Sequence, residues 1–207
     1  MANDYGTIPS ARAATREDEL RAATWTLLGN LLAAPPDDRV LGVLRGIAMT
    51  SDEGQGDAMA EAWHELRRAS EAADPEALNV EFHDLFIGVA GGELTPYSSW
   101  YQTGSLMERP LIRLRQDLQQ LGLERQEGNS DPEDHAAAVC DVMALVISDE
   151  DVSYDWQREI FQKHVEPWMD RFFNDVKGAE NAKFYRAVGR LGGAFFALEQ
   201  EYFSMLA

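Results

Sequence analysis

Acidic side chains stand close to histidines at two places in the sequence where they could do chemistry. Asp134 and His135 are neighbours in "DPEDHAAAVC", and Glu61 and His64 have the Glu-x-x-His spacing of di-iron helical bundles. A di-iron site needs a second such motif and two further glutamates on facing helices, and the sequence has no second copy. We therefore interpret Glu61 and His64 as an ordinary exposed pair, whereas Asp134 and His135 are retained as candidate site residues.

The Asp134-His135 pair has a structural and a functional interpretation. His135 heads an apolar series at helical spacing, formed by Val139, Val142 and Val146, so its side chain is expected to point inward or into a groove. In the structural interpretation Asp134 stabilises the positive end of a helix and His135 is a satisfied core histidine. In the functional one the pair is a polar contact on a binding surface, or it serves a small helical enzyme.

The segment "GGELTPYSSWYQTG" is the second candidate, because it places three aromatic residues between glycines and a proline. Clustered aromatic rings bury large apolar areas, so a role in the core competes with a role in ligand binding. The glycine and proline frame favours a long loop between helices. The candidate peptide-binding residues of this segment are Gly91, Gly92, Pro96, Tyr97, Ser99, Trp100 and Tyr101.

Other common chemical signatures are missing from the sequence. It has no Gly-x-x-x-x-Gly-Lys-Ser/Thr loop, no Gly-x-Ser-x-Gly elbow and no Gly-x-Gly-x-x-Gly fingerprint. The single cysteine, Cys140, excludes an internal disulfide and a cysteine-based zinc cluster, and its apolar neighbours favour a buried, unreactive thiol. We therefore expect that the protein binds no metal and no cofactor. The single cysteine also fits a reducing compartment, so we expect the protein to be located in the cytoplasm.

The elements that position these residues are predicted to be helices throughout. Caps, prolines and apolar spacing predict a first helix that starts at Thr15 and has a buried side formed by Leu20, Leu27, Leu28, Leu31 and Leu32. Further helices are predicted through 39–49, around Trp63, from Asp74 to Gly88, from Asp131 onward, and twice after Trp156 with a break near Lys177. Another is predicted over 105–122, with Leu106 on its apolar face and its regular part starting at Pro110. No segment alternates at period two for long enough to be a strand. The prediction is all-α, one domain over 1–207, a helical bundle of about eight or nine helices, with 1–14 a flexible N-terminus.

The charge distribution narrows the class of partner. A net charge of −18 disfavours nucleic acids and anionic membranes and favours a basic partner. Lys and Arg are absent from 69–108 and from 126–157, the two stretches that contain the aromatic segment and the Asp134-His135 pair. Each stretch alone could be a solvated face. If the fold brings them together, they would form an aromatic groove with acidic walls for a basic and apolar peptide.

Three motifs in the same order resemble the TorD/DmsD family of cytoplasmic redox-enzyme maturation chaperones. "EFHDLFIGVAGGELTPYSSWY" is similar to that family's Leu-Phe-x-Gly and Pro-Tyr-x-Ser-x-Tyr segments, and "DPEDHAA" is similar to its Glu-Pro-x-Asp-His segment. The stretch from His164 and Trp168 resembles its His-x-x-x-Trp-x-x-x-Phe-Phe region. Two departures are Asp131, where the family has Glu, and Ala136, where isoleucine is common.

The resemblance implies an all-α, non-catalytic protein that binds the twin-arginine signal peptide of a molybdenum-cofactor oxidoreductase, or the apo-enzyme, and delays export until cofactor insertion. It implies that the aromatic segment, Asp134 and His135 border the peptide site. No nucleic acid and no stable membrane insertion are expected, and the protein is expected to be a monomer or a domain-swapped dimer. The alternative is a small helical enzyme or a nucleotide-binding protein that uses the Asp134-His135 region.

Overall fold

The chain folds into helices throughout its described part, which confirms the all-α prediction. The structure is a computed structural model that describes residues 14–47, 57–88, 91–123 and 131–205. These residues contain α1 (Arg16–Ala33), α2 (Asp38–Gly46), α3 (Ala58–Glu71), α4 (Pro75–Phe82), α5 (Ser98–Thr103), α6 (Arg109–Gln120), α7 (Ala136–Ser148), α8 (Tyr154–Ile160), α9 (Met169–Gly178) and α10 (Phe184–Met205), with π-helical turns η1 (His83–Ile87) and η2 (Phe161–Val165). Of the expected flexible stretch 1–14, all but Ala14 lies outside the described residues.

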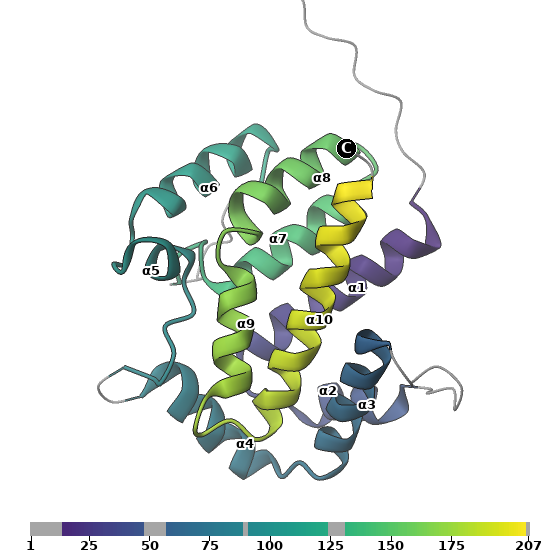
Figure 1. Ribbon diagram of the computed structural model, residues 1–207, viewed down its shortest axis with the longest axis vertical. Helices are drawn as coiled ribbons and strands as arrows, with labels where there is room; N and C mark the ends of the chain where they lie inside the picture. The colour runs from purple at the N-terminus through teal and green to yellow at the C-terminus, as the bar shows by residue number, and fades with distance from the viewer. Residues whose placement is uncertain (1–13, 48–56, 89–90, 124–130, 206–207) are drawn as a thin grey trace, which may run out of the picture.

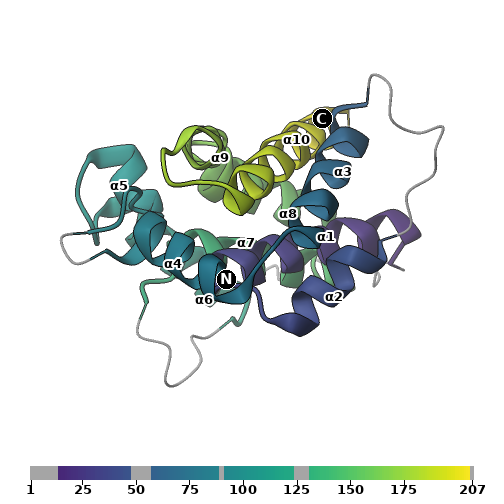
Figure 2. The same cartoon turned by 90° about the horizontal axis from the view of Figure 1, so that it is seen from below.

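The long helices form two packed groups. The helix α1 packs along α7, and α10 packs along α9 on one side and α3 on the other. Figure 2 shows α9 and α10 above α1 and α7, and Figure 1 shows α5 and α6 at the edge away from α2 and α3. Large side chains are buried in the core, including Trp168 and Phe172, and Trp25 of α1 lies edge to face with Phe195 of α10 with ring centroids 5.0 Å apart. None of the described helices is long and apolar enough to cross a membrane.

Several helix starts are as predicted from the sequence. Thr15 caps α1 in a capping box with Asp18, and Asp74 caps α4 with Pro75 in its first turn. Leu28, Leu31 and Leu32 of α1 are buried, but Leu20 is 55% exposed. The prediction that Leu20 belongs to the buried side of α1 was therefore wrong.

Other boundaries differ from the prediction, and the reasons are tertiary. The helix expected to begin at Asp131 begins at Ala136, because the backbone around His135 pairs with the aromatic segment instead. The region after Trp156 is divided by η2 and a turn before α9, and the aromatic segment contains the short helix α5 rather than only loop. These additions bring the number of α-helices in the described ranges to ten, against the eight or nine expected.

Buried carboxylates join distant helices. Arg21 of α1 donates to Glu199 of α10 at 2.5 and 3.0 Å and to Asp18 at 3.2 Å, and the Trp25 indole also donates to Glu199 at 3.0 Å. Glu81 of α4 is buried and accepts the backbone N–H groups of 183–185 at the start of α10. Such contacts satisfy the exposed amides of a helix start and fix the ends of α10 against α1 and α4.

Candidate functional site

The two sequence segments singled out above meet in the structure. Tyr97 and His135 form an isolated antiparallel bridge, in which Ser98 N donates to Asp134 O at 2.9 Å and Ala136 N donates to Pro96 O at 2.8 Å. The rings of Tyr97 and His135 lie edge to face with centroids 5.0 Å apart. The fold thus brings together the two stretches that lack Lys and Arg, as the charge argument required.

Asp134 is the buried link between the segments. Its side chain is 1% exposed, and its Oδ2 accepts a hydrogen bond of 2.8 Å from the backbone N of Ser99. Ser99 is also buried, and its Oγ accepts from the backbone N of Glu108 at 3.2 Å. Asp134 Oδ1 has no hydrogen-bond partner among the described residues. Asp134 and Ser99 therefore shape the site from beneath, and one carboxylate oxygen of Asp134 is left to accept a further donor.

His135 is half-buried and is the N-cap of α7. Its Nδ1 accepts a hydrogen bond of 3.1 Å from Ala137 N, so the neutral ring has its proton on Nε2. Burial lowers the pKa of His135, and the nearby carboxylates of Asp131 and Asp134 offset part of this effect. His135 is half-buried rather than fully buried, and its ring nitrogen is used to cap α7, while Val139, Val142 and Val146 of the same series are buried.

Stability is expected to fall as the pH drops below the ordinary histidine pKa of 6.5, because the native pKa of His135 is lowered. In this window the unfolded chain binds more protons, so the contribution is complete above pH 6.5 and is lost as the pH falls toward the native pKa. The pKa of buried His164 is lowered by burial as well. The free energy of unfolding should therefore decrease between pH 7.5 and 5.5. In His135→Asn, which keeps a capping oxygen, we expect this decrease to be smaller by about 1 kcal/mol, as measured by denaturant titrations at the two pH values.

The matched control for this experiment is Leu145→Ala, at an exposed residue of α7. It removes no titratable group, so it should leave the pH dependence as in the parent protein. If His135→Asn melts normally at pH 7.5 but its stability changes with pH as in the parent protein, the prediction is contradicted. His135 would then have the same pKa in the folded and unfolded chains.

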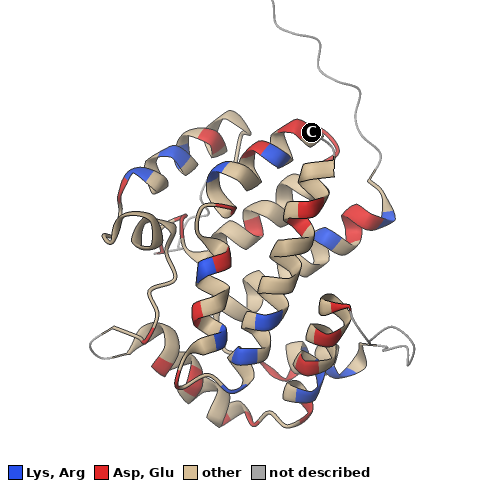
Figure 3. Ribbon diagram, viewed as in Figure 1, with Lys and Arg blue, Asp and Glu red and all other residues tan. Residues whose placement is uncertain are grey.

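The three aromatic residues of the segment have different surroundings. Trp100 is 44% exposed, and Tyr97 is half-buried. Tyr101 packs against Trp168 and Phe172, and its hydroxyl donates to Asp175 of α9 at 3.0 Å, so it anchors α5. Figure 3 shows α5 without a charged residue. Trp100 is thus the exposed aromatic residue of the predicted set, and Tyr97, Tyr101 and His135 are half-buried.

The glycines and the proline act through the backbone. A Cβ on Gly92 would come within 2.5 Å of Leu85 O, so only glycine allows this approach to η1. Gly91 has φ 95°, a conformation that favours glycine, and Pro96 is buried with its carbonyl in the bridge. These three residues position the segment.

The predicted acidic walls are only partly available. Glu81 caps α10, and Glu93 accepts the backbone N–H groups of Glu180 and Asn181 at 2.6 and 3.2 Å. Glu133 is paired with Arg115 at 2.7 Å. Asp131 is exposed and acts on both Tyr97 and His135. Asp131 and Asp134 both act on Tyr97 and His135, so negative charge lies next to the bridge.

Two apolar residues beside the site were not predicted. Leu106 and Met107 follow α5 in a turn, and their side chains are exposed. Leu106 had been assigned to a helix face, but the helix α6 begins only at Arg109. Gly104, which ends α5 at φ 78°, was the available signal for a break before them.

The other candidates from the sequence do not form a cluster. Glu61 is exposed and His64 is half-buried on α3, and among the described residues no group of three His, Cys, Asp or Glu side chains is arranged to hold a metal. Cys140 is fully buried, as expected, and burial raises the pKa of its thiol. His164 is buried and paired with Asp117 at 2.8 Å.

Comparisons with known proteins agree on one group. Residues 52–174, more than half of the chain, match the family described as nitrate reductase delta subunit. Proteins named chaperone protein TorD match at 25% identity in Vibrio parahaemolyticus, over 66% of this chain and 69% of that protein, and at 27% in Vibrio cholerae, over 63% and 64%. A crystal structure of a candidate redox enzyme maturation protein from Archaeoglobus fulgidus superposes with a TM-score of 0.56 at 20% identity, covering 90% of this chain and 95% of that one.

Proposed function

Because the chain belongs to the nitrate reductase delta subunit family, we propose that it is a chaperone in the maturation of a molybdenum-cofactor oxidoreductase. The resemblance to TorD/DmsD chaperones that the sequence motifs indicated is confirmed by the matches to TorD proteins. The alternative, a small helical enzyme or a nucleotide-binding protein, has no support among these relatives, which are named chaperones. In this proposal the protein is not an enzyme and acts in the cytoplasm, as a monomer or a domain-swapped dimer.

The proposed ligand is the twin-arginine signal peptide of the client, or the apo-enzyme that carries it. The observation that supports this most directly is the bridge between Tyr97 and His135, which joins the aromatic segment to Asp134, a buried carboxylate whose Oδ1 has no hydrogen-bond partner among the described residues. Arginine side chains of the signal would meet the field of Asp131 and Asp134, and the apolar part would contact Tyr97 and Trp100. Binding of this kind holds back export without any catalytic step.

A synthetic signal peptide with two arginines and its apolar stretch is expected to bind in the micromolar range or tighter by calorimetry. Replacing both arginines with glutamine should weaken binding about tenfold or more at low salt, because it removes charge-assisted contacts. Moderate salt should weaken the arginine peptide more than the glutamine peptide, since screening acts on partly exposed ion pairs. Candidate peptides are the signals of molybdoenzymes encoded next to this gene.

Trp100→Ala tests where the peptide binds, because removing this exposed side chain should leave the fold intact. It should weaken both peptides at every salt concentration, whereas Leu145→Ala, at an exposed leucine of α7, should weaken neither. Failure of all signal peptides and of the full-length precursor to bind at low salt would refute the chaperone proposal. Equal binding by Trp100→Ala and Leu145→Ala would instead refute only this location.

A further inference from the structure

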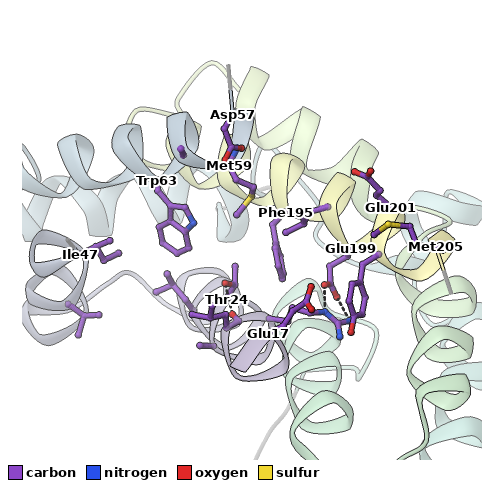
Figure 4. A pocket seen from close by; sticks show the side chains of 18 residues that line it. Glu17, Thr24, Ile47, Asp57, Met59, Trp63, Phe195, Glu199, Glu201 and Met205 are labelled. Carbon is purple, nitrogen blue, oxygen red and sulfur yellow. Dashed lines mark hydrogen bonds and ion pairs between the residues drawn. The ribbon is translucent and has the colours of Figure 1, made fainter. Parts of the chain in front are cut away.

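A large apolar groove lies apart from the site just described and shares no residue with it. It has a volume of ≈ 820 Å³ and runs between α1, the 43–47 end of α2, the start of α3 and the C-terminal half of α10. Figure 4 shows Trp63 and Met59 facing Thr24 across it, with Phe195 between Met59 and Glu199 and Met205 at one end. Four large apolar side chains on its walls are unusually exposed: Leu20 at 55%, Val43 at 60%, Leu198 at 46% and Met205 at 67%.

Several polar side chains along this groove are already satisfied within the protein. The hydroxyl of Thr24 donates to Leu20 O at 2.8 Å, and the guanidinium of Arg21 is held by Glu199 and Asp18. An extended peptide lying on such walls would have few partners for its backbone N–H and C=O groups. A helix satisfies its own backbone, so the groove favours a helical occupant that offers an apolar face.

Charge selects the kind of helix. Glu17, Asp57 and Glu201 border the groove, and Arg21, the sole cation among the described residues that line it, is neutralised by its buried carboxylate partners. A second copy of this chain would bring a molecule of net charge −18 against the same acidic border, which is unfavourable. A cationic partner meets the border with opposite charge and the walls with apolar side chains.

We infer that this groove docks a cationic amphipathic helix of a partner protein, with leucine-like side chains on Leu20, Val43, Trp63 and Leu198 and with Lys or Arg beside Glu17 and Glu201. The inference does not depend on signal-peptide binding at Trp100, since the two surfaces have no residue in common. Methionine and leucine side chains can adjust their rotamers, so the groove accepts related helices rather than one sequence.

The probe is a peptide of leucine and lysine, about 14 residues long, with leucines at helical spacing, so that it forms an amphipathic helix on binding. It should bind the full chain, as followed by calorimetry, and should gain helical circular dichroism. The same peptide with glutamate in place of lysine should bind at least about tenfold more weakly. Leu198→Asp should weaken the lysine peptide at least about tenfold, whereas Ile112→Asp, at an exposed residue of α6, should leave it unchanged.

The charged border is tested by Glu17→Gln combined with Glu201→Gln, which should weaken the lysine peptide about threefold to tenfold and reduce its salt dependence. The control is Glu76→Gln, at an exposed glutamate of α4. Equal loss of binding in Leu198→Asp and Ile112→Asp, or no loss in either, would overturn the inference, because the peptide would then bind through net charge alone or at another surface. The inference would also be overturned if the parent protein is a dimer, Leu198→Asp is a monomer, and both bind the peptide equally. The groove would then be assigned to contact with a second copy of the chain.

Discussion

Glu199→Gln is expected to destabilise the protein by about 3 kcal/mol, because it leaves the buried guanidinium of Arg21 without its main counter-charge. Glu199 is fully buried, and both of its carboxylate oxygens accept hydrogen bonds from Arg21. The Trp25 indole donates to the same carboxylate. Urea titration at pH 7 measures the effect as a lowered midpoint with an unchanged slope.

The matched control is Glu19→Gln, which breaks the exposed pair with Arg16 on the same helix and should change stability little. Replacing both members, with Arg21→Met and Glu199→Leu, should regain part of the loss, because the buried guanidinium is removed together with its partner, while buried Asp18 loses Arg21 and the Trp25 indole loses its acceptor. A Glu199→Gln protein as stable as the parent would mean that Asp18 alone compensates Arg21.

Gly189→Ala is expected to destabilise the protein by about 1–3 kcal/mol, although alanine is the better helix former. A Cβ at this position of α10 would lie 2.6 Å from the backbone N of Lys177 and 2.9 Å from Phe173 O. Both atoms belong to the backbone of α9, so the two helices would have to separate. Thermal or urea unfolding of the variant measures the cost.

Gly193, one turn further along α10, is the internal control. A Cβ there meets nothing within 4 Å, so Gly193→Ala should stabilise the protein by up to about 1 kcal/mol through helix propensity alone. Opposite signs for the two variants would establish the close approach of α9 and α10. Stabilisation by both would contradict it.

The helices that could be predicted are those with local signals. Thr15, Asp74 and Pro75 act within one turn of the chain, so their effect is visible in sequence order, and the structure places α1 and α4 where they indicate. The aromatic segment and the Asp134-His135 pair were also found by residue type and by the absence of Lys and Arg. Their meeting was a conditional prediction, and the bridge at Tyr97 and His135 confirms it.

The start of α7 could not be predicted, because it depends on residues far away in the chain. "DP" at 131–132 has the appearance of a cap and first turn, yet His135 N donates to Pro132 O in a turn, and Ala136 N donates to Pro96 O. The backbone hydrogen bonds that a helix at 131–136 would need are taken by the aromatic segment. The exposed groove was missed for a similar reason, since Leu20 fits the apolar spacing of α1 but is left exposed by the helices that the structure describes.

The pairing of Arg21 with Glu199 has a consequence for the order of events during synthesis. The two residues are separated by 178 positions, so at about 5–20 residues per second Arg21 and the Trp25 indole wait roughly 10 to 35 seconds for their partner. The neighbour of α1 along most of its length, α7, is also made late. The helix α1 is therefore synthesised well before these partners, and its apolar face stays open to non-native contacts throughout that interval.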